Sequence, residues 1–338
     1  MKIIVAGVTG LVGQEILEVL TELSPQVTSI VPVASERSAG KKISFRGDPY
    51  KVVSFPEAKH SGAEYAIFSA GAAVSRQWAY DYAAHGITVV DNSSAWRNDA
   101  EVPLVVPEVN ADTISRNDKI IANPNCSTIQ MVAALSPLHR YYRIKRIVVA
   151  TYQSVSGSGA AGIEQLEAER AHREPARKAY PHPIDLNVLP HGGDFLEQGY
   201  TTEEVKLVDE TRKILEAPKM AITATVVRVP VTGGHAEAVN VEFEKSFRLK
   251  DIRQLLEDRS GIIVEDRPSE NIYPMPLHIR KSNFTHVGRI RRDFSTEHGL
   301  NLWIVADNLR KGAATNAVQI LNTLTRGREN DHPSEGRK

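Results

Sequence analysis

One thiol stands out among the residues that could do chemistry, because the chain of 338 residues contains a single cysteine. Cys126 lies between Asn125 and Ser127, directly before a stretch with helical periodicity at 127–138. A cysteine at a helix N-terminus has a lowered pKa and a larger thiolate fraction, so this position favours a nucleophile. The alternative is a buried structural cysteine, but polar neighbours at an element boundary argue against it. One cysteine without a histidine cluster does not suit a metal ion, and no metal site is predicted.

An arginine and a histidine flank a Pro/Gly turn between two expected strands. Arg228 and His235 stand at the two ends of the segment RVPVTGGH. A guanidinium binds carboxylates in a bidentate manner, and an imidazole titrates near neutral pH. From its surroundings alone, His235 suits an acid/base role or an ordinary surface loop equally well.

A glycine-rich turn near the N-terminus has the chemistry of a phosphate-binding loop. It follows a short apolar run at 2–7 and opens a helical pattern that Ser24-Pro25 ends. Its spacing is G-x-x-G-x-x-G, with a threonine in the middle slot of the usual G-x-G-x-x-G. Glycines let the backbone approach a pyrophosphate, and the helix start supplies N–H donors, although an ordinary strand–helix turn has a similar pattern. We predict dinucleotide contacts from Gly7, Thr9, Gly10, Leu11, Val12 and Gly13.

The adenosine ribose is expected at the end of the second strand, about 20 residues beyond the loop. Arg37, with Ser35 and Ser38 beside it, suits the 2′-phosphate of NADP. Glu36 suits the free 2′-hydroxyl of NAD instead, and a solvated charged loop is the third alternative. We predict NADP.

The elements that position these residues divide at about residue 125. Before it, apolar β-branched runs alternate with helical patterns, which predicts a Rossmann-type, doubly wound parallel sheet. The expected strands are at 2–7, 28–34, 64–70 and 87–90, and a helix is expected at 73–85.

Beyond residue 125, long strands predict an α+β catalytic and dimerisation domain with a broad mixed sheet. The expected strands are at 144–151, 221–229, 236–243 and 300–306. A helix at 309–325 has Leu309, Ala313, Ala317, Ile320 and Leu324 on one face, and we expect it to return to the first sheet. The predicted domains are 1–124 plus 308–330 for NADP and 125–307 for catalysis and dimerisation, with a disordered tail at 331–338.

Composition excludes several classes of protein. Apolar residues make up 41% and charged residues 24%, and the formal net charge is +0. A neutral chain without a basic tract gives no reason to propose nucleic acid or a membrane surface as a partner. No signal-peptide pattern opens the chain and no apolar run approaches about 20 residues, so we expect a cytoplasmic protein.

The motifs together resemble those of the aspartate-β-semialdehyde dehydrogenase family, in family order over nearly the whole chain. The resemblance is to the shorter bacterial-type branch, which carries an SxRSAG loop. The most specific stretches are GVTGLVG (7–13), ASERSAGKK (34–42), IIANPNCSTIQM (120–131), TYQSVSGSG (151–159), RVPVTGGH (228–235) and GLNLWIVADNLRKGAA (299–314). The sequence departs from the family pattern at Val8, at Ala236 and at 191–194, which reads HGGD.

The resemblance implies reduction of L-4-aspartyl phosphate to L-aspartate 4-semialdehyde by NADPH, through a thioester on Cys126. It implies that Asn125 holds the oxyanion, that Gln153 orients the substrate and that His235 is the acid/base. The implied substrate ligands are Arg228 for the α-carboxylate, Glu203 for the α-ammonium, and Arg97 and Lys206 for the phosphate. The implied further cofactor contacts are Gly71, Ser156, Gly157, Ser158 and Asn308.

The implied activity is a phosphorylating aldehyde dehydrogenase in the biosynthesis of lysine and diaminopimelate, threonine, methionine and isoleucine. The resemblance also implies a homodimer through the sheet of the second domain, with a tetramer as the alternative. N-acetyl-γ-glutamyl-phosphate reductase is the nearest rival, but it usually carries GCY-P where this chain has NCST. A non-catalytic nucleotide-binding paralogue and a cysteine hydrolase are more distant rivals. The first would be expected to lose the cysteine or histidine, and the second leaves the glycine loop unexplained.

Overall fold

The computed structural model describes residues 1–329, which form two compact units. Of the described residues, the first unit contains Met1–Pro124 and 313–329, and the second contains Asn125–Gly312. The tail predicted to be disordered, 331–338, lies outside the described residues. Among the helices within residues 1–329, none is both long and apolar enough to cross a membrane.

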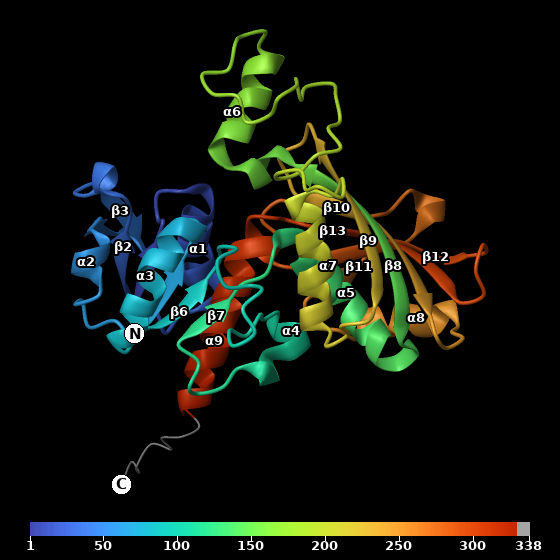
Figure 1. Cartoon of the computed structure of the whole chain (residues 1–338), viewed down its shortest axis with the longest axis horizontal. Helices are drawn as coiled ribbons and strands as arrows, with labels where there is room; N and C mark the ends of the chain where they lie inside the picture. Colours follow the sequence, from blue (N-terminus) through green and yellow to red (C-terminus); the bar gives the residue numbers. More distant parts are fainter. Residues whose placement is uncertain (330–338) are drawn as a thin grey trace. The chain divides into compact units, whose positions relative to one another are not determined.

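A five-stranded parallel sheet forms the centre of the first unit (Figure 1). Its strands, in spatial order, are β2 (Ser29–Val33), β1 (Lys2–Ala6), β5 (Tyr65–Phe68), β6 (Thr88–Asp91) and β7 (Ile120–Ala122). Four of the five residues of β1 are fully buried, as expected for a parallel strand covered on both faces. The predicted doubly wound sheet is confirmed.

Helices cover both faces of this sheet. On one face lie α1 (Leu11–Leu23) and α9 (Thr315–Glu329), and on the other lies α3 (Ala72–Ala84), where Tyr82 meets Phe68 edge to face at 5.1 Å. The shorter elements of this unit are β3 (Lys42–Phe45), β4 (Asp48–Lys51), α2 (Phe55–Ala58) and α4 (Pro107–Asn110). The β3–β4 hairpin, β7 and the two short helices were not predicted.

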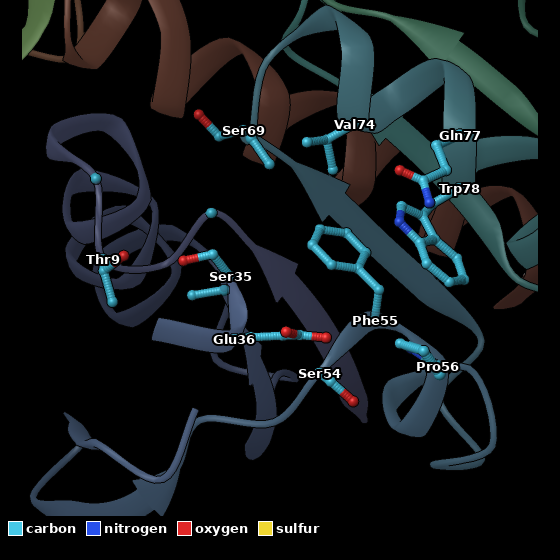
Figure 2. Close-up of a pocket in the computed structure, with 14 residues that line it drawn as sticks. Thr9, Ser35, Glu36, Ser54, Phe55, Pro56, Ser69, Val74, Gln77 and Trp78 are labelled. Carbon is cyan, nitrogen blue, oxygen red and sulfur yellow. The ribbon is translucent and has the colours of Figure 1, made fainter. Parts of the chain in front are cut away.

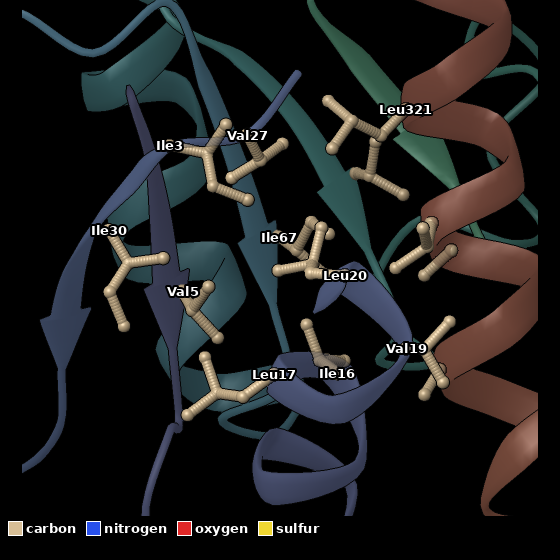
Figure 3. Packing of buried hydrophobic residues seen from close by; sticks show 14 of the residues in the cluster. Ile3, Val5, Ile16, Leu17, Val19, Leu20, Val27, Ile30, Ile67 and Leu321 are labelled. Carbon is tan, nitrogen blue, oxygen red and sulfur yellow. The ribbon is translucent and has the colours of Figure 1, made fainter. Parts of the chain in front are cut away.

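The last helix packs on the first sheet, as the apolar stripe predicted. Figure 3 shows Leu321 of α9 in the same buried cluster as Ile3 and Ile67 of the sheet. The helix begins later than predicted, because a π-helical turn at Arg310–Ala314 precedes it.

The second unit is built on a six-stranded mixed sheet. Its order is β11 (Ile262–Val264), β12 (Thr285–Asp293), β13 (Gly299–Ala306), β10 (His235–Phe243), β8 (Ile144–Ser154) and β9 (Ala221–Val229). The pairs β8–β9 and β11–β12 are parallel and the other pairs are antiparallel, so the predicted mixed sheet is confirmed. In β10, Val239, Val241 and Phe243 are buried while Asn240 and Glu242 are half-buried, which confirms the predicted alternation.

Within residues 1–329, the helices of this unit that pack on the second sheet lie over one face of it. They are α5 (Cys126–Tyr142), α7 (Thr202–Ile214) and α8 (Leu249–Glu257). The fourth helix, α6 (Gly159–Arg170), extends with the following loop beyond the end of the sheet (Figure 1). The sequence analysis predicted α5 but missed α6, α7, α8 and the strands β11 and β12.

Candidate active site

Cys126 is the first residue of the 17-residue helix α5. Asn125 is the N-cap, and its Oδ1 accepts a hydrogen bond of 3.0 Å from the Ser127 backbone N–H. The same Oδ1 lies 3.9 Å from the Cys126 Sγ, and the cysteine is half-buried. The thiol therefore lies at the positive end of a long helix dipole, which favours the thiolate.

Helix α7 holds the residue that precedes the thiol. Both donors of Asn125 point at carboxylates of this helix: its backbone N–H donates to Glu210 at 2.6 Å, and its side-chain Nδ2 donates to Glu203 at 2.8 Å. Glu203 also pairs with Lys206 at 2.6 Å. Three residues predicted as substrate or phosphate ligands are thus linked in one network beside Cys126.

His235 opens β10 and is fully buried, which excludes an ordinary surface-loop histidine. The Ser154 backbone N–H donates to its Nδ1 at 3.0 Å, so the neutral ring carries its proton on Nε2. Burial, helped by the charge of Arg228, holds the pKa of His235 well below its ordinary value. The ring is therefore neutral and presents an N–H at Nε2.

A glycine makes room for this ring. A Cβ at Gly157 would lie 3.1 Å from His235 Nε2 and 2.8 Å from Arg228 Nη1. Both side chains therefore approach the turn at Val155–Ser158. Any larger residue at 157 would displace one of them.

Arg228 lies on β9 and is buried. Its Nη1 donates to the Ser154 carbonyl oxygen at 2.7 Å, while its Nε has no hydrogen-bond partner among the described residues. Ser154 thus binds Arg228 through its carbonyl and His235 through its N–H. A buried guanidinium with donor capacity to spare suits an anionic ligand.

Gln153 precedes that serine on β8 and is also buried. Its Nε2 donates to the Ser127 hydroxyl at 3.1 Å. This bond joins the strand to the first turn of the helix that carries Cys126. Cys126, Gln153, Arg228 and His235 are therefore connected through shared neighbours in one unit.

The residues predicted on the nicotinamide side cluster at the same turn. The Ser156 hydroxyl donates to Asn308 Oδ1 at 3.0 Å, and the Tyr180 hydroxyl donates to Ser158 at 2.8 Å. Gly312 is a neighbour that the sequence analysis missed: a Cβ there would lie 2.9 Å from that of Cys126. The only sequence signal for it was the small-residue run GAA.

The glycine loop lines a cavity of about 520 Å³ in the first unit, which is within the range of small-molecule sites (Figure 2). Gly7 has φ of 81°, and a Cβ there would lie 2.2 Å from the Ser69 carbonyl oxygen, so only glycine fits. Opposite the loop, Phe55 stacks on Trp78 with ring centroids 5.6 Å apart, an apolar wall that the sequence analysis missed. Of the predicted loop contacts, the cavity lining includes Gly7, Thr9 and Gly10. Leu11, Val12 and Gly13 lie in the first turn of α1 and do not line it.

Of the residues predicted near the adenosine ribose, some line the cavity and others do not. Ser35 and Glu36 line it, whereas Arg37 is exposed and Ser38 buried in the 3-10 turn at Glu36–Ser38, outside the lining. Gly71, with φ of 89°, is the N-cap of α3 and is also outside the lining.

Arg97 is placed in the first unit and is 8% exposed. Its Nη2 donates to the Asn92 carbonyl oxygen at 3.0 Å. Arg97 therefore belongs to the first unit, whereas the network around Cys126 belongs to the second.

Two family models match the chain. Residues 2–117 match the semialdehyde dehydrogenase NAD-binding domain, and residues 135–311 match the semialdehyde dehydrogenase dimerisation domain. Aspartate-semialdehyde dehydrogenase of Aquifex aeolicus is 47% identical over 96% of this chain and 98% of its own length. That of Bacillus subtilis is 40% identical, with 96% and 97% covered. The chain belongs to the aspartate-semialdehyde dehydrogenase family.

The fold agrees with solved members of that family. Aspartate-semialdehyde dehydrogenase II of Vibrio cholerae, solved in complex with its ligand ASA, superposes with a TM-score of 0.92 at 43% identity, covering 96% of this chain and 98% of that one. The enzyme of Candida albicans, solved with NADP, gives 0.75 at 26% identity, with the same coverage. The chain is thus an oxidoreductase of amino-acid biosynthesis with an NAD(P)-binding domain and a dimerisation domain, and the family predicted from the motifs is confirmed.

Proposed function

We propose that this chain uses NADPH to reduce L-4-aspartyl phosphate to L-aspartate 4-semialdehyde through a thioester on Cys126. The reaction serves the biosynthesis of lysine through diaminopimelate and of threonine, methionine and isoleucine. The observation that carries the proposal is the network joining Cys126, Gln153, Arg228 and His235 through Ser127, Ser154 and Gly157.

The first step is acyl transfer. The Cys126 thiolate attacks the acyl carbon of the substrate, a C–S bond forms, and the C–O bond to phosphate breaks as inorganic phosphate leaves. Backbone N–H groups at the start of α5 stabilise the oxyanion. We also assign Asn125 to this task, although its Nδ2 already donates to Glu203 in this structure.

The second step reduces the thioester. NADPH, when bound, supplies the hydride to the thioester carbon. The Nε2–H of His235 donates a hydrogen bond to the negatively charged oxygen on that carbon and keeps its proton, because Nδ1 of the neutral ring already accepts from the Ser154 N–H. Cleavage of the C–S bond then releases the aldehyde and regenerates the thiolate, while Gln153 orients the acyl group.

Substrate recognition follows from charge. Arg228 binds the α-carboxylate, for which its buried and incompletely paired guanidinium is suited. Glu203 binds the α-ammonium, and it exchanges its contact with Asn125 or Lys206 to do so. Lys206 and Arg97 are assigned to the phosphate on the family resemblance.

The proposed cofactor is NADP, held by the first unit as the nucleotide-binding domain. The Candida albicans relative was solved with NADP. The 2′-phosphate is assigned to Arg37, Ser35 and Ser38, of which Ser35 lies in the cavity wall. Glu36, also in the wall, favours NAD instead, so the preference is measurable as a ratio of kcat/KM values. The other assigned cofactor contacts are Leu11, Val12, Gly13, Gly71, Ser156, Gly157, Ser158 and Asn308.

The second unit is proposed as the catalytic and homodimerisation domain. The face of its sheet that no helix covers carries half-exposed apolar side chains, including Tyr152 and Trp303, whose rings are 5.5 Å apart. Half-exposed apolar side chains on such a face suit a second copy of the chain.

One assay tests the function. We expect phosphate-dependent reduction of NADP when the purified protein is given aspartate semialdehyde, and little with N-acetylglutamate semialdehyde. The acetylated substrate lacks the α-ammonium that Glu203 is proposed to bind. Faster reduction with the acetylated substrate would assign the chain to the rival reductase activity, and no phosphate dependence would exclude the acyl-phosphate chemistry.

A further inference from the structure

A buried carboxyl lies beneath the nucleophile helix and has no part in the mechanism above. Glu237 on β10 is 0% exposed. It follows His235 by two residues, and side chains two apart on a strand point to the same face of the sheet. The face it shares with His235 is the one that α5 covers.

The groups around Glu237 are neutral and polar. Ser127 and Gln130 of α5 approach the carboxyl, and Thr151 is its cross-strand neighbour on β8. Within residues 1–329, no ion pair involves Glu237. In the same part of the chain, neither carboxyl oxygen has a partner of normal hydrogen-bond geometry, and the same holds for Gln130 Oε1 and Thr151 Oγ1.

A protonated, uncharged carboxyl explains how Glu237 can be fully buried without an ion pair. Burial raises the pKa of Glu237 well above its ordinary value, and the approach of Gln130 and Ser127 offsets only part of that effect. A neutral carboxyl has one O–H to donate and a carbonyl oxygen to accept. The Ser127 hydroxyl needs an acceptor, and the carbonyl oxygen of a neutral Glu237 supplies one.

The Ser127 hydroxyl connects this carboxyl to the reaction. Its oxygen accepts from Gln153 Nε2 at 3.1 Å, so its own hydrogen points elsewhere. With Glu237 as the acceptor, donation runs from Gln153 to Ser127 to Glu237. This direction turns the amide nitrogen of Gln153 toward Ser127 and leaves its carbonyl oxygen for the substrate.

We infer that Glu237 is a positioning residue, which fixes the orientation of the Gln153 amide through the Ser127 hydroxyl. The inference rests on the role of Gln153 in the proposed function. Gln130 also belongs to this group of buried polar residues between α5 and β10. Its Nε2 donates to the His235 carbonyl oxygen at 3.4 Å, at the start of β10.

Three substitutions test the direction of donation. Glu237→Met fills a similar volume without an acceptor, and we expect kcat with aspartate semialdehyde to fall roughly ten- to a hundredfold, because a loosened Gln153 misplaces the substrate. Glu237→Gln keeps an acceptor and a donor and is expected to recover most of that loss. Ser127→Ala removes the middle member and is expected to reproduce the loss. The affinity for NADP should stay the same in all three.

A double-mutant cycle separates positioning from general damage. In a Gln153→Ala background, we expect Glu237→Met to cost less than twofold in kcat, because the group it positions is gone. Val239→Ala, at the next inward position of β10, is the matched control, and its effect should be the same with Gln153 present or absent. Should Glu237→Met fail to fold, Ser127→Ala completes the same cycle.

The inference is overturned if Glu237→Met, or Ser127→Ala in its place, leaves kcat unchanged, or if its loss is as large without Gln153 as with it. Failure of the proposed function is a separate result, because it appears as a wild-type protein without phosphate-dependent activity toward aspartate semialdehyde.

Discussion

Cys126 is the only thiol in the chain, so its chemistry can be tested without interference. We expect Cys126→Ala to abolish turnover and to leave NADP affinity intact, because the nucleotide cavity belongs to the other unit. His235→Asn should differ by retaining residual activity, since loss of one hydrogen-bond donor to the oxyanion costs about 10²–10³-fold. Steady-state rates and a cofactor titration of both variants provide the comparison. Substantial turnover by Cys126→Ala would exclude the covalent mechanism.

Glu237 also predicts a pH dependence of stability. Its pKa is raised in the folded protein from 4.5, so above that pH the folded state holds a proton that the unfolded state releases. The contribution of this carboxyl to the free energy of unfolding is therefore most favourable below about pH 4.5, and it declines as pH rises from there toward the folded pKa. The slope is about 1.4 kcal/mol per pH unit for one proton.

Glu237→Gln removes this titration. We expect the difference in melting temperature between the variant and the wild type to shift in favour of the variant as pH increases from about 5 to about 8. The difference should be smallest at the acidic end. Thermal unfolding at several pH values measures it. Val239→Ala is the control, whose offset from the wild type should not vary with pH. A constant offset for Glu237→Gln would mean that the carboxyl titrates normally.

Motifs pointed to the residues proposed to react, but not to the buried polar residues Gln130 and Glu237 beneath them. Cys126 and His235 were found because their neighbours in sequence are distinctive. Gln130 and Glu237 interact across a helix and a strand, and no spacing in the sequence shows that contact. One signal was present: with Val239 and Val241 pointing inward, alternation puts Glu237 on the apolar face, where a carboxyl needs an explanation.

At the scale of elements, a strand rich in apolar residues was predicted, whereas a helix that buries polar residues was missed. The strand at 221–229 was predicted with its observed bounds, because β-branched residues fill it. Helix α7 was missed because much of its buried face is polar: Glu204, Glu210 and Thr211 are all buried. That face hydrogen-bonds to the loop before Cys126 and does not simply pack, so the usual apolar stripe is absent.

Helix α9 provides a test of how the first unit is held together. Leu321 is fully buried in the cluster that also contains Ile3 and Ile67. We expect Leu321→Ala to lower the free energy of unfolding by about 2–5 kcal/mol, because the cavity it leaves lies between helix and sheet. Chemical denaturation measures the change. Arg326→Ala, on the exposed side of the same helix, should stay within about 0.5 kcal/mol of wild type. Equal effects of the two changes would mean that α9 does not stabilise the sheet.

At the scale of the whole molecule, the uncovered face of the second sheet predicts the oligomeric state. In a two-fold dimer both copies contribute the same face to the interface. A charge introduced there is therefore present twice and is removed from water in both copies. We expect Tyr152→Glu to weaken dimerisation by at least about tenfold, measured by sedimentation over a dilution series. Tyr141→Glu, at an exposed tyrosine near the end of α5, is the control and should remain dimeric. A dimeric Tyr152→Glu would place the interface elsewhere.

The first unit takes its strands from the start of the chain and the helix α9 from its end. A ribosome synthesises the strands first and α9 last, with the whole of the second unit in between. Until α9 emerges, the sheet face around Ile3 and Ile67 lacks part of its apolar cover and is open to chaperones or to aggregation. The second unit is continuous and has all its elements available earlier. During translation, the unit that contains β1 and α9 is therefore completed only after the second unit has been synthesised.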